Sequence, residues 1–332
     1  MRRDAWLRIP VGSHAQPDLQ LPAPALREAH LMSRVALITA DVARARDEDL
    51  APLLAACGNS GLDADVVSWN TPNVELSGYG AAVLRSPWDY TDRLDEFLAW
   101  CERCASQTLL LNPIEVVRWN TDKHYLADLA RAGIACVPST FAEPGEDARQ
   151  AILGFLDTHI AATEFVVKPA VGAGSRGARR FTRAEVDTAT AHAAGLLNAD
   201  RSVLLQPYLA RVDARGETAL MYFDHVFSHA IRKGPLLPLG SAATDGLFAP
   251  EAIMPRDPTP RERTLGDAVV GAVGTRFPHL APLAYVRVDL LHDDQDEPCV
   301  LELELVEPSL FFAHGPGSAA RFAGVLAARL QT

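Results

Sequence analysis

The sequence predicts an α/β fold in which an open parallel sheet at the N-terminus is followed by α+β domains. Over the first 120 residues, short apolar runs rich in Val, Leu and Ile alternate with segments of helical spacing. Such alternation is typical of a parallel sheet with helices on its faces. Later in the chain, paired strand-like runs joined by short turns predict antiparallel hairpins. The length of 332 residues allows two or three domains.

Apolar runs and helical segments alternate in the predicted N-terminal sheet. The runs 35–39, 64–69 and 81–86 are bounded by polar turns, as buried strands are. Helical spacing covers residues 47 to 57, ends at Gly58 and returns in "RLDEFLAWCE", while "TLLLN" predicts a last strand. Because ligands bind at the carboxyl ends of the strands in such sheets, we expect a site at that edge.

The second half of the chain mixes helices with strands. A helix is predicted over 122–132, and strands over "EFVVKP" and "SVLLQPYL". The runs "ETALMYF" and "VFSHAIRK" flank Asp224 and His225, which predicts a hairpin. Pro260 opens a predicted helix that extends to about Arg276, since proline is favoured in the first turn. Strands at "AYVRVDLL" and "CVLELELV" precede a C-terminal helix of small residues.

Composition and charge disfavour several classes of protein. The formal net charge is −11 and the 31 Lys and Arg residues are dispersed, so the phosphates of a nucleic acid would repel the chain. No apolar run reaches the roughly 18–20 residues of a membrane span. Residues 1–31 are rich in proline and lack the apolar core of a secretory signal, so we expect a flexible extension, native or not. Five cysteines, an odd number, fit a reduced cytoplasmic protein, and the lone pair Cys101 and Cys104 is interpreted as inert thiols.

A glycine-rich loop follows Lys168 in "EFVVKPAVGAGSRG". Glycines let the backbone take positive φ and bring N–H groups close to phosphate oxygens, and Lys168 at the strand end could reach the same phosphates. The loop is neither a Walker A sequence nor a dinucleotide fingerprint, because a strand-like stretch follows it. A flexible hairpin loop is the alternative interpretation. The candidate residues are Gly172, Gly174, Ser175, Arg176 and Gly177.

Three carboxylates, Asp289, Glu302 and Glu304, are predicted to converge on two neighbouring strands. Alternation places Glu302 and Glu304 on one face of a strand, with Leu301, Leu303 and Leu305 on the other. Carboxylates this close are unfavourable without a cation, and hard oxygen ligands suit Mg²⁺. A solvated acidic sheet face is the alternative interpretation.

The segment "RSPWDYT" lies at the carboxyl end of a predicted strand. Arg85 could bind a substrate carboxylate through two parallel hydrogen bonds. A capped loop whose tryptophan packs into the core is the alternative. His225 and His229 are in a strand and are not expected to bind zinc together. The residues predicted to line a polar, aromatic substrate pocket are Ser86, Trp88, Asp89 and Tyr90.

These motifs, in this order, resemble the ATP-grasp superfamily in its glutathione-synthetase-like branch. The resemblance implies three domains, at 32–120, 121–208 and 209–332, with ATP enclosed between two α+β lobes. It implies that Lys123 in "NTDKHYL" and Lys168 contact phosphates, that the glycine-rich loop is a flap, and that Asp289 and Glu302 bind the metal. Further implied contacts are Gln206, Tyr208 and Leu209 at adenine, Glu217 near the ribose, and Arg232 or Lys233 at the transferred phosphate.

One departure concerns the metal site. The family usually has E-x-N on the last strand, whereas this chain has Glu302-Leu303-Glu304, and Glu307 competes with Glu304 to complete the site. Within the superfamily, "RSPWDY" and "LELELVEPSLFF" are similar to the cycloserine synthetases, which cyclise O-ureido-D-serine with ATP.

The resemblance implies an ATP- and Mg²⁺-dependent ligase that phosphorylates a small-molecule carboxylate and couples it to an amine. The amine comes from the same molecule, as in D-cycloserine formation, or from a second substrate; a non-catalytic ATP-binding module is a further alternative. A nucleotide-dependent oxidoreductase is disfavoured, because "TADVARARDED" after the first strand lacks the glycine fingerprint. Many relatives are dimers, so a homodimer is also left open.

Overall fold

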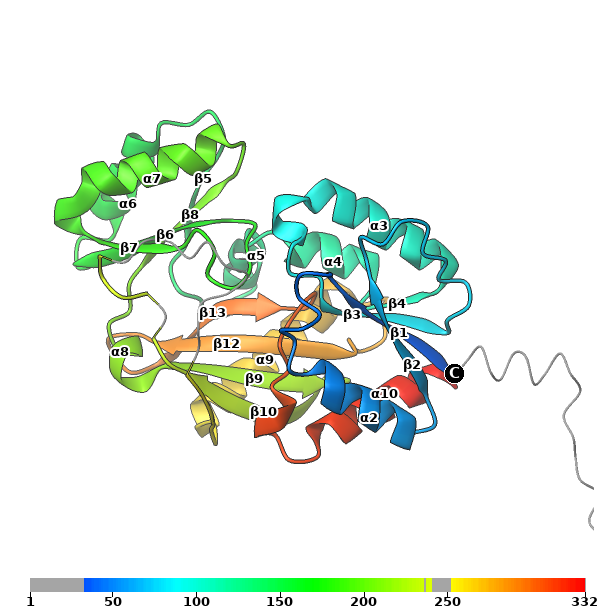
Figure 1. The fold of residues 1–332 in the computed structure, drawn as a ribbon. Helices are drawn as coiled ribbons and strands as arrows, with labels where there is room; N and C mark the ends of the chain where they lie inside the picture. The colour runs from blue at the N-terminus through cyan, green and yellow to red at the C-terminus, as the bar shows by residue number, and fades with distance from the viewer. Residues whose placement is uncertain (1–32, 236, 241–251, 332) are drawn as a thin grey trace, which may run out of the picture.

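The computed structural model describes residues 33–235, 237–240 and 252–331. The extension predicted for residues 1–31 lies outside the described residues. Three sheets form the framework, and the strands of each sheet come from one continuous part of the chain. Figure 1 shows them as an N-terminal sheet, a lobe that stands apart and a central five-stranded sheet.

The N-terminal sheet is parallel, in the order β2-β1-β3-β4. In β1, Val35 and Leu37 pack against α2 and the C-terminal helix α10, while Ala36 and Ile38 pack against α3. The sheet is therefore buried on both faces, which explains its continuous apolar runs. Its elements are β1 (Arg34–Thr39), α2 (Leu50–Asn59), β2 (Asp63–Ser68), β3 (Ala81–Ser86), the short 3₁₀ turn η1 (Tyr90–Asp92), α3 (Leu94–Gln107), β4 (Leu109–Leu111) and α4 (Ile114–Asn120).

The second sheet is antiparallel, in the order β5-β8-β6-β7, and carries helices on one face only. Phe165 and Val167 of β6 pack against α6 and α7, so alternation turns Val166 and Lys168 to the opposite face. The elements are α5 (Tyr125–Arg131), β5 (Thr140–Ala142), α6 (Ala148–Thr158), β6 (Glu164–Pro169), β7 (Arg179–Thr182), η2 (Arg183–Glu185), α7 (Val186–Asn198) and β8 (Val203–Pro207).

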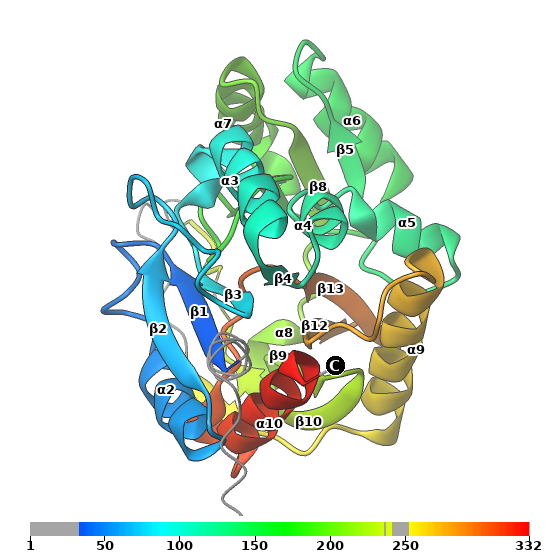
Figure 2. The ribbon, with the colours of Figure 1, turned by 90° about the vertical axis from the view of Figure 1, so that its right-hand side faces the viewer.

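The central sheet has five antiparallel strands in the order β11-β10-β9-β12-β13. Helix α9 covers one face with Val269, Val270 and Val273 (Figure 2). Asp224 and His225 have φ of 53° and 62° in the predicted β9–β10 turn, the left-handed conformation that tight hairpins need. The elements are α8 (Val212–Arg215), β9 (Glu217–Phe223), β10 (Val226–Lys233), β11 (Ile253–Pro255), α9 (Pro260–Arg276), β12 (Tyr285–His292), β13 (Pro298–Glu304), η3 (Phe312–His314) and α10 (Ser318–Leu330).

The C-terminal helix α10 joins the first sheet to the central one. Phe322 and Leu326 are fully buried in a core that also includes Leu53 of α2 and Met221 of β9. In Figure 1 the two helices lie side by side, although they come from opposite ends of the chain. The N-terminal sheet is thereby fixed against the sheet that carries the charged residues described below.

Two buried asparagines reinforce this junction. Asn112 donates to the carbonyl oxygens of Tyr285 and Leu305 at 3.0 and 2.9 Å and accepts from the backbone N–H of Ala284 at 2.9 Å. Asn120 makes two further backbone hydrogen bonds to β13 and the residue after it. These side chains supply hydrogen bonds that the ends of the strands would otherwise lack.

We expect Asn112→Ala to lower the free energy of unfolding by about 2–3 kcal/mol, because it leaves three buried backbone groups without a partner. Chemical denaturation followed by circular dichroism measures the change. Asn198→Ala, at an exposed helix end, is the matched control and should change the stability little. Equal stability of the two variants would contradict the role assigned to Asn112.

Candidate active site

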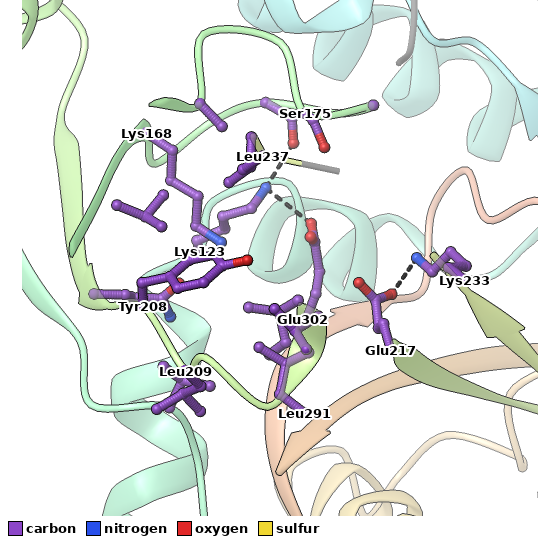
Figure 3. A pocket seen from close by; sticks show the side chains of 18 of the residues that line it. Lys123, Lys168, Ser175, Tyr208, Leu209, Glu217, Lys233, Leu237, Leu291 and Glu302 are labelled. Carbon is purple, nitrogen blue, oxygen red and sulfur yellow. Dashed lines mark hydrogen bonds and ion pairs between the residues drawn. The ribbon is translucent and has the colours of Figure 1, made fainter. Parts of the chain in front are cut away.

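A cavity of about 150 Å³ lies between the open face of the second sheet and the central sheet. Figure 3 shows lysines from the upper lobe above carboxylates from the central sheet. Both positively and negatively charged side chains therefore line the cavity. The predicted residues that line it are Lys123, Lys168, Gly172, Gly174, Ser175, Arg176, Gln206, Tyr208, Leu209, Glu217, Lys233, Glu302 and Glu304.

Lys123 and Lys168 approach the cavity from different elements. Lys123 precedes α5, and its ammonium donates to the carbonyl oxygen of Gly172 at 2.6 Å and pairs with Glu302 at 2.9 Å. Burial alone lowers the pKa of Lys123, but the carboxylate of Glu302 raises it overall. Lys168 is the penultimate residue of β6, and burial lowers its pKa to about 8, with the charge of Lys123 opposing protonation further. Together they place two positive charges where polyphosphate oxygens could bind.

The glycine-rich loop crosses the cavity and reaches the N-terminal domain. Gly174, Ser175 and Gly177 all have positive φ, as the sequence predicts for a loop that exposes its backbone N–H groups. Arg176 donates to Asp92 at 2.8 Å and to the hydroxyl of Thr91 at 3.3 Å. The guanidinium therefore holds the glycine-rich loop, the predicted flap, against η1. The sequence did not predict this contact. Gly177 does not line the cavity.

The connection after β8 forms the side wall. The amide of Gln206 donates to the hydroxyl of Ser139 at 2.9 Å, so its side chain is already engaged in the wall. The guanidinium of Arg180 lies 3.4 Å from the centroid of the Tyr208 ring and holds the ring in place. This leaves Tyr208 and the apolar side chain of Leu209 as a flat surface suited to an aromatic base.

One face of the central sheet gathers the charged residues. Asp289 of β12 lies opposite Glu302 of β13, and Arg287 lies opposite Glu304. Arg287 donates to Asp289 at 2.8 Å and also pairs with Glu304. Lys233 of β10 pairs with Asp289 at 2.8 Å and with Glu217 of β9. Every one of these charges is thus neutralised by a neighbour within the site.

The pKa values of these carboxyls diverge. Burial by itself raises the pKa of Asp289, but Arg287 and Lys233 hold it well below its usual range. Burial raises the pKa of Glu217 to about 8 against the opposing charge of Lys233. Burial also raises the pKa of Glu304, reinforced by Asp289 against the effect of Arg287. Shifts in opposite directions among neighbouring carboxyls are typical of functional sites.

The carboxylates fit a divalent metal in chemistry but are arranged around cations. Glu302 and Glu304 line the cavity with hard oxygen donors, as Mg²⁺ requires, whereas Asp289 is covered by Arg287 and Lys233. Among the described residues, no three His, Cys, Asp or Glu side chains are grouped as a metal site. Of the two competitors, Glu304 lines this cavity and Glu307 lines a second one. A metal bound here would have to displace Lys123 from Glu302 and Arg287 from Glu304.

Arg232 and Lys233 are neighbours in β10 and point to opposite faces. Lys233 lines the cavity, whereas Arg232 donates to the carbonyl oxygens of Arg215 and Ala214 at 2.6 and 3.1 Å outside it. Strand alternation is the reason. The structure therefore separates the two candidates and corrects the placement of Arg232, which lies outside the cavity.

A second cavity of about 370 Å³ adjoins the first. Ala173 and Gly174 of the flap, together with Arg287 and Glu304 of the central sheet, line both cavities. The reacting groups of two ligands could meet at this junction. The sequence pointed to Trp88 and, as a competing metal ligand, to Glu307, but not to Arg46, Asp47, Glu48, Arg287, Ser309, Phe311 or His314, which also line the second cavity.

Alternation gave a signal for Arg287 that was overlooked, since it stands two residues before Asp289 on the same face of β12. Residues 46–49 follow β1 at the carboxyl end of the parallel sheet, where ligands are expected. The segment 309–314 gives no comparable signal, because it becomes part of the cavity only through the packing of the chain ends.

The "RSPWDY" residues are mostly buried, and only one of them lines the second cavity. Arg85 is fully buried and donates to the carbonyl oxygen of Pro308 at 3.1 Å. Ser86 bonds to Thr39 at 2.8 Å, Asp89 accepts from Trp69 at 2.7 Å, and Tyr90 donates to Glu307 at 2.6 Å. Burial explains why these side chains contact protein instead of lining the cavity; among them only Trp88 does so.

Several enzymes share this fold at low sequence identity. An ATP-grasp ligase, PsnB, complexed with minimal precursor, Mg and ADP, matches with a TM-score of 0.60 and 17% identity over 90% of this chain and 97% of that one. D-alanine–D-alanine ligase from Bacillus anthracis matches with a TM-score of 0.55 and 15% identity over 90% of this chain and 94% of that one. These matches show that the chain has the ATP-grasp fold, as the resemblance predicted.

More similar proteins narrow the class. A family model described as the N-terminal domain of D-cycloserine synthetase DcsG matches residues 35–112. Cycloserine biosynthesis protein DcsG of Streptomyces lavendulae is 42% identical over 301 residues, covering 90% of this chain and 100% of that protein. The crystal structure of D-cycloserine synthetase DcsG matches with a TM-score of 0.86 and 41% identity, over 90% of this chain and 99% of that one. This chain belongs to the D-cycloserine synthetase family.

The opposite orientations of Lys233 and Arg232 give a matched pair of variants. We expect Lys233→Met to lower kcat at least about a hundredfold, because it removes a cation from the wall of the first cavity. Arg232→Met should retain wild-type kcat within about threefold, since its side chain lies on the other face. Steady-state ADP release measures both, and the reverse ranking would contradict the placement.

The lowered pKa of Lys168 predicts a pH-dependent affinity for ADP. Above about pH 8 the free ammonium loses its proton, whereas bound phosphates favour the charged form, so affinity should fall by up to about tenfold per pH unit. Binding should then take up protons, as calorimetry in buffers of different ionisation enthalpy detects. Lys168→Arg stays charged and should flatten this fall. The variant also shows that the pH dependence comes from Lys168 and not from Glu217, whose pKa is also about 8. Identical pH profiles for both proteins would contradict the prediction.

Proposed function

We propose that this chain is an ATP-dependent cyclo-ligase that closes a ring within one small amino-acid substrate, O-ureido-D-serine, to form D-cycloserine. The observation that carries the proposal is the junction of the two cavities at Arg287, Glu304 and the flap. One cavity has the lysines and the flat wall that suit ATP. The other is lined by Arg46 and Arg287 as well as by Asp47, Glu48 and Glu307, a mixture suited to a zwitterion. The family membership supports the same substrate.

In the proposed reaction, a substrate carboxylate oxygen attacks the γ-phosphorus of ATP and ADP leaves. Glu302 and Glu304 would hold Mg²⁺, which would supply positive charge against the negative charge that develops on the phosphates. Lys123 and Lys168 bind phosphate oxygens, and Lys233 and Arg287 lie where negative charge increases. The protein's part is thus to position two anions that would otherwise repel each other.

Ring closure follows from the substrate's own nucleophile. The ureido nitrogen attached to oxygen attacks the acyl carbon, a C–N bond forms, and phosphate leaves. Water then removes the carbamoyl group from the ring nitrogen as carbamic acid, which decomposes to ammonia and carbon dioxide. The flap protects the acylphosphate from water before ring closure, and the Arg176–Asp92 ion pair holds it against the N-terminal domain.

The proposal is tested by ADP release from the purified protein with ATP, Mg²⁺ and O-ureido-D-serine. We expect ADP, phosphate and D-cycloserine in equal amounts, the last identified by mass spectrometry, and loss of turnover with a chelator. Lys168→Ala should abolish turnover while circular dichroism shows an intact fold.

Other outcomes of this assay assign the alternatives. ADP release that needs a separate acid and amine would establish intermolecular ligation and sink the cycloserine proposal. Nucleotide binding without turnover over a broad acid and amine panel would instead favour a non-catalytic ATP-binding module.

We also infer that the protein acts in the cytoplasm, where ATP is available and its five cysteines, all free thiols, stay reduced. None of the helices in the described part of the chain is both long and apolar enough to span a bilayer. A homodimer stays a prediction.

A further inference from the structure

The two motifs that resemble the cycloserine synthetases contact each other in the fold. The indole of Trp88 donates to the carbonyl oxygen of Glu307 at 3.0 Å, and the Tyr90 hydroxyl donates to the Glu307 carboxylate at 2.6 Å. Arg85 donates to the carbonyl oxygen of Pro308. The N-terminal domain thus holds the start of the segment that follows β13, residues 307–312, by three hydrogen bonds to Glu307 and Pro308. We call this segment the cavity strap, because Glu307, Ser309 and Phe311 line the second cavity.

Asp49 provides the closest contact with the cavity strap. Its carboxylate accepts three consecutive backbone N–H groups, from Leu310 at 2.6 Å, Phe311 at 3.0 Å and Phe312 at 2.8 Å. Phe311 adopts the left-handed conformation, with φ 51° and ψ 45°. A large aromatic residue rarely takes this conformation, and the turn directs successive N–H groups to one anion. Asp49 therefore compensates a backbone conformation that is unfavourable by itself.

Arg85 lies behind this carboxylate. Its Nη2 is 3.7 Å from Asp49, and both side chains are buried. The Nε and Nη1 of Arg85 have no hydrogen-bond partner among the described residues, which is costly for a buried cation. The charge of Arg85 therefore has one main electrostatic role, to compensate the buried carboxylate that holds the strap.

The strap in turn contacts the reaction centre. The Ser309 carbonyl oxygen accepts a hydrogen bond from Nη1 of Arg287 at 3.2 Å, and the Phe311 ring lies 5.6 Å from the Arg287 guanidinium carbon. Arg287 lines both cavities. A displacement of the strap would therefore move the wall of the second cavity and one support of Arg287, while leaving the lysines of the ATP cavity in place.

We propose that Asp49 and Arg85 are a positioning pair that fixes the cavity strap and thereby sets the affinity for the amino-acid substrate. Asp49 also lines the second cavity, but both of its oxygens accept backbone N–H groups of the strap, so it acts through the strap. This inference deepens the proposed function and rests on it for the identity of the substrate. Under this proposal Arg85, predicted from the sequence to bind the substrate, acts on it from a fully buried position and without contact.

The kinetic test compares Asp49→Asn with Asp65→Asn. The amide has one acceptor oxygen and no charge, so it cannot serve three N–H groups. We expect the KM for O-ureido-D-serine to rise at least about tenfold, with the Kd for ADP unchanged within about twofold. Asp65 lies on β2, the edge strand of the N-terminal sheet, and pairs with Arg34 of β1 away from the cavities. Its variant should behave as wild type. A parallel loss of ADP affinity, or an unchanged KM, would overturn the proposal.

A double-mutant cycle tests whether Arg85 acts through Asp49. Arg85→Met should raise the same KM, and Asp49→Asn/Arg85→Met should be no worse than Asp49→Asn alone, since the second change removes a charge with no partner left. Additive effects of the two substitutions would overturn the pairing.

Hydrogen exchange tests the strap without any substrate. Peptides that cover 307–314 should exchange faster in full-length Asp49→Asn than in wild type, while peptides from β6 and β8 stay unchanged. Unchanged exchange in 307–314 would overturn the positioning role even if the KM rises. If wild type does not turn over O-ureido-D-serine, the proposed function fails, and the exchange result still decides whether Asp49 holds the strap.

Discussion

The structure depends on a network of buried charges on one face of the central sheet. A charge removed from water is costly unless an opposite charge and hydrogen bonds replace the solvent. Arg287 lies between Asp289 and Glu304, and Lys233 lies between Asp289 and Glu217, so neighbouring strands supply alternating signs. The central sheet can therefore carry so many buried charges only because the positive and negative side chains neutralise one another.

Strand alternation makes this arrangement compatible with a stable fold. The same strands that carry charges on one face carry Val286, Val288 and Leu220 on the other, where α9 covers them. The lobe that supplies Lys168 follows the same rule, with Phe165 and Val167 turned into its own core. Each half of the site is thus the polar face of an element whose apolar face is already buried, and the cavity forms where two polar faces meet.

The sequence predicted the elements better than their contacts. The strand 81–86 and the helix 260–276 have the predicted bounds, because apolar periodicity and an N-terminal proline are local signals. Alternation also placed Glu302 and Glu304 on one face. It could not show that Arg85 is buried beneath the strap, because that depends on Asp49 and on a segment about 220 residues further along the chain. Nor could it choose between Arg232 and Lys233 until the pairing of β10 with β9 was known.

The ion pairs of the site imply that the nucleotide and the metal proposed above would bind cooperatively. Without ligands, Lys123 neutralises Glu302, and Arg287 neutralises Glu304. A nucleotide that draws Lys123 toward its phosphates would leave Glu302 with an uncompensated charge, which favours a divalent cation at that carboxylate. A cation bound first would in turn release Lys123 for phosphate, so each ligand lowers the cost of binding the other. The ion pairs that stabilise the charged face of the sheet are in this way the ones that would exchange partners on binding.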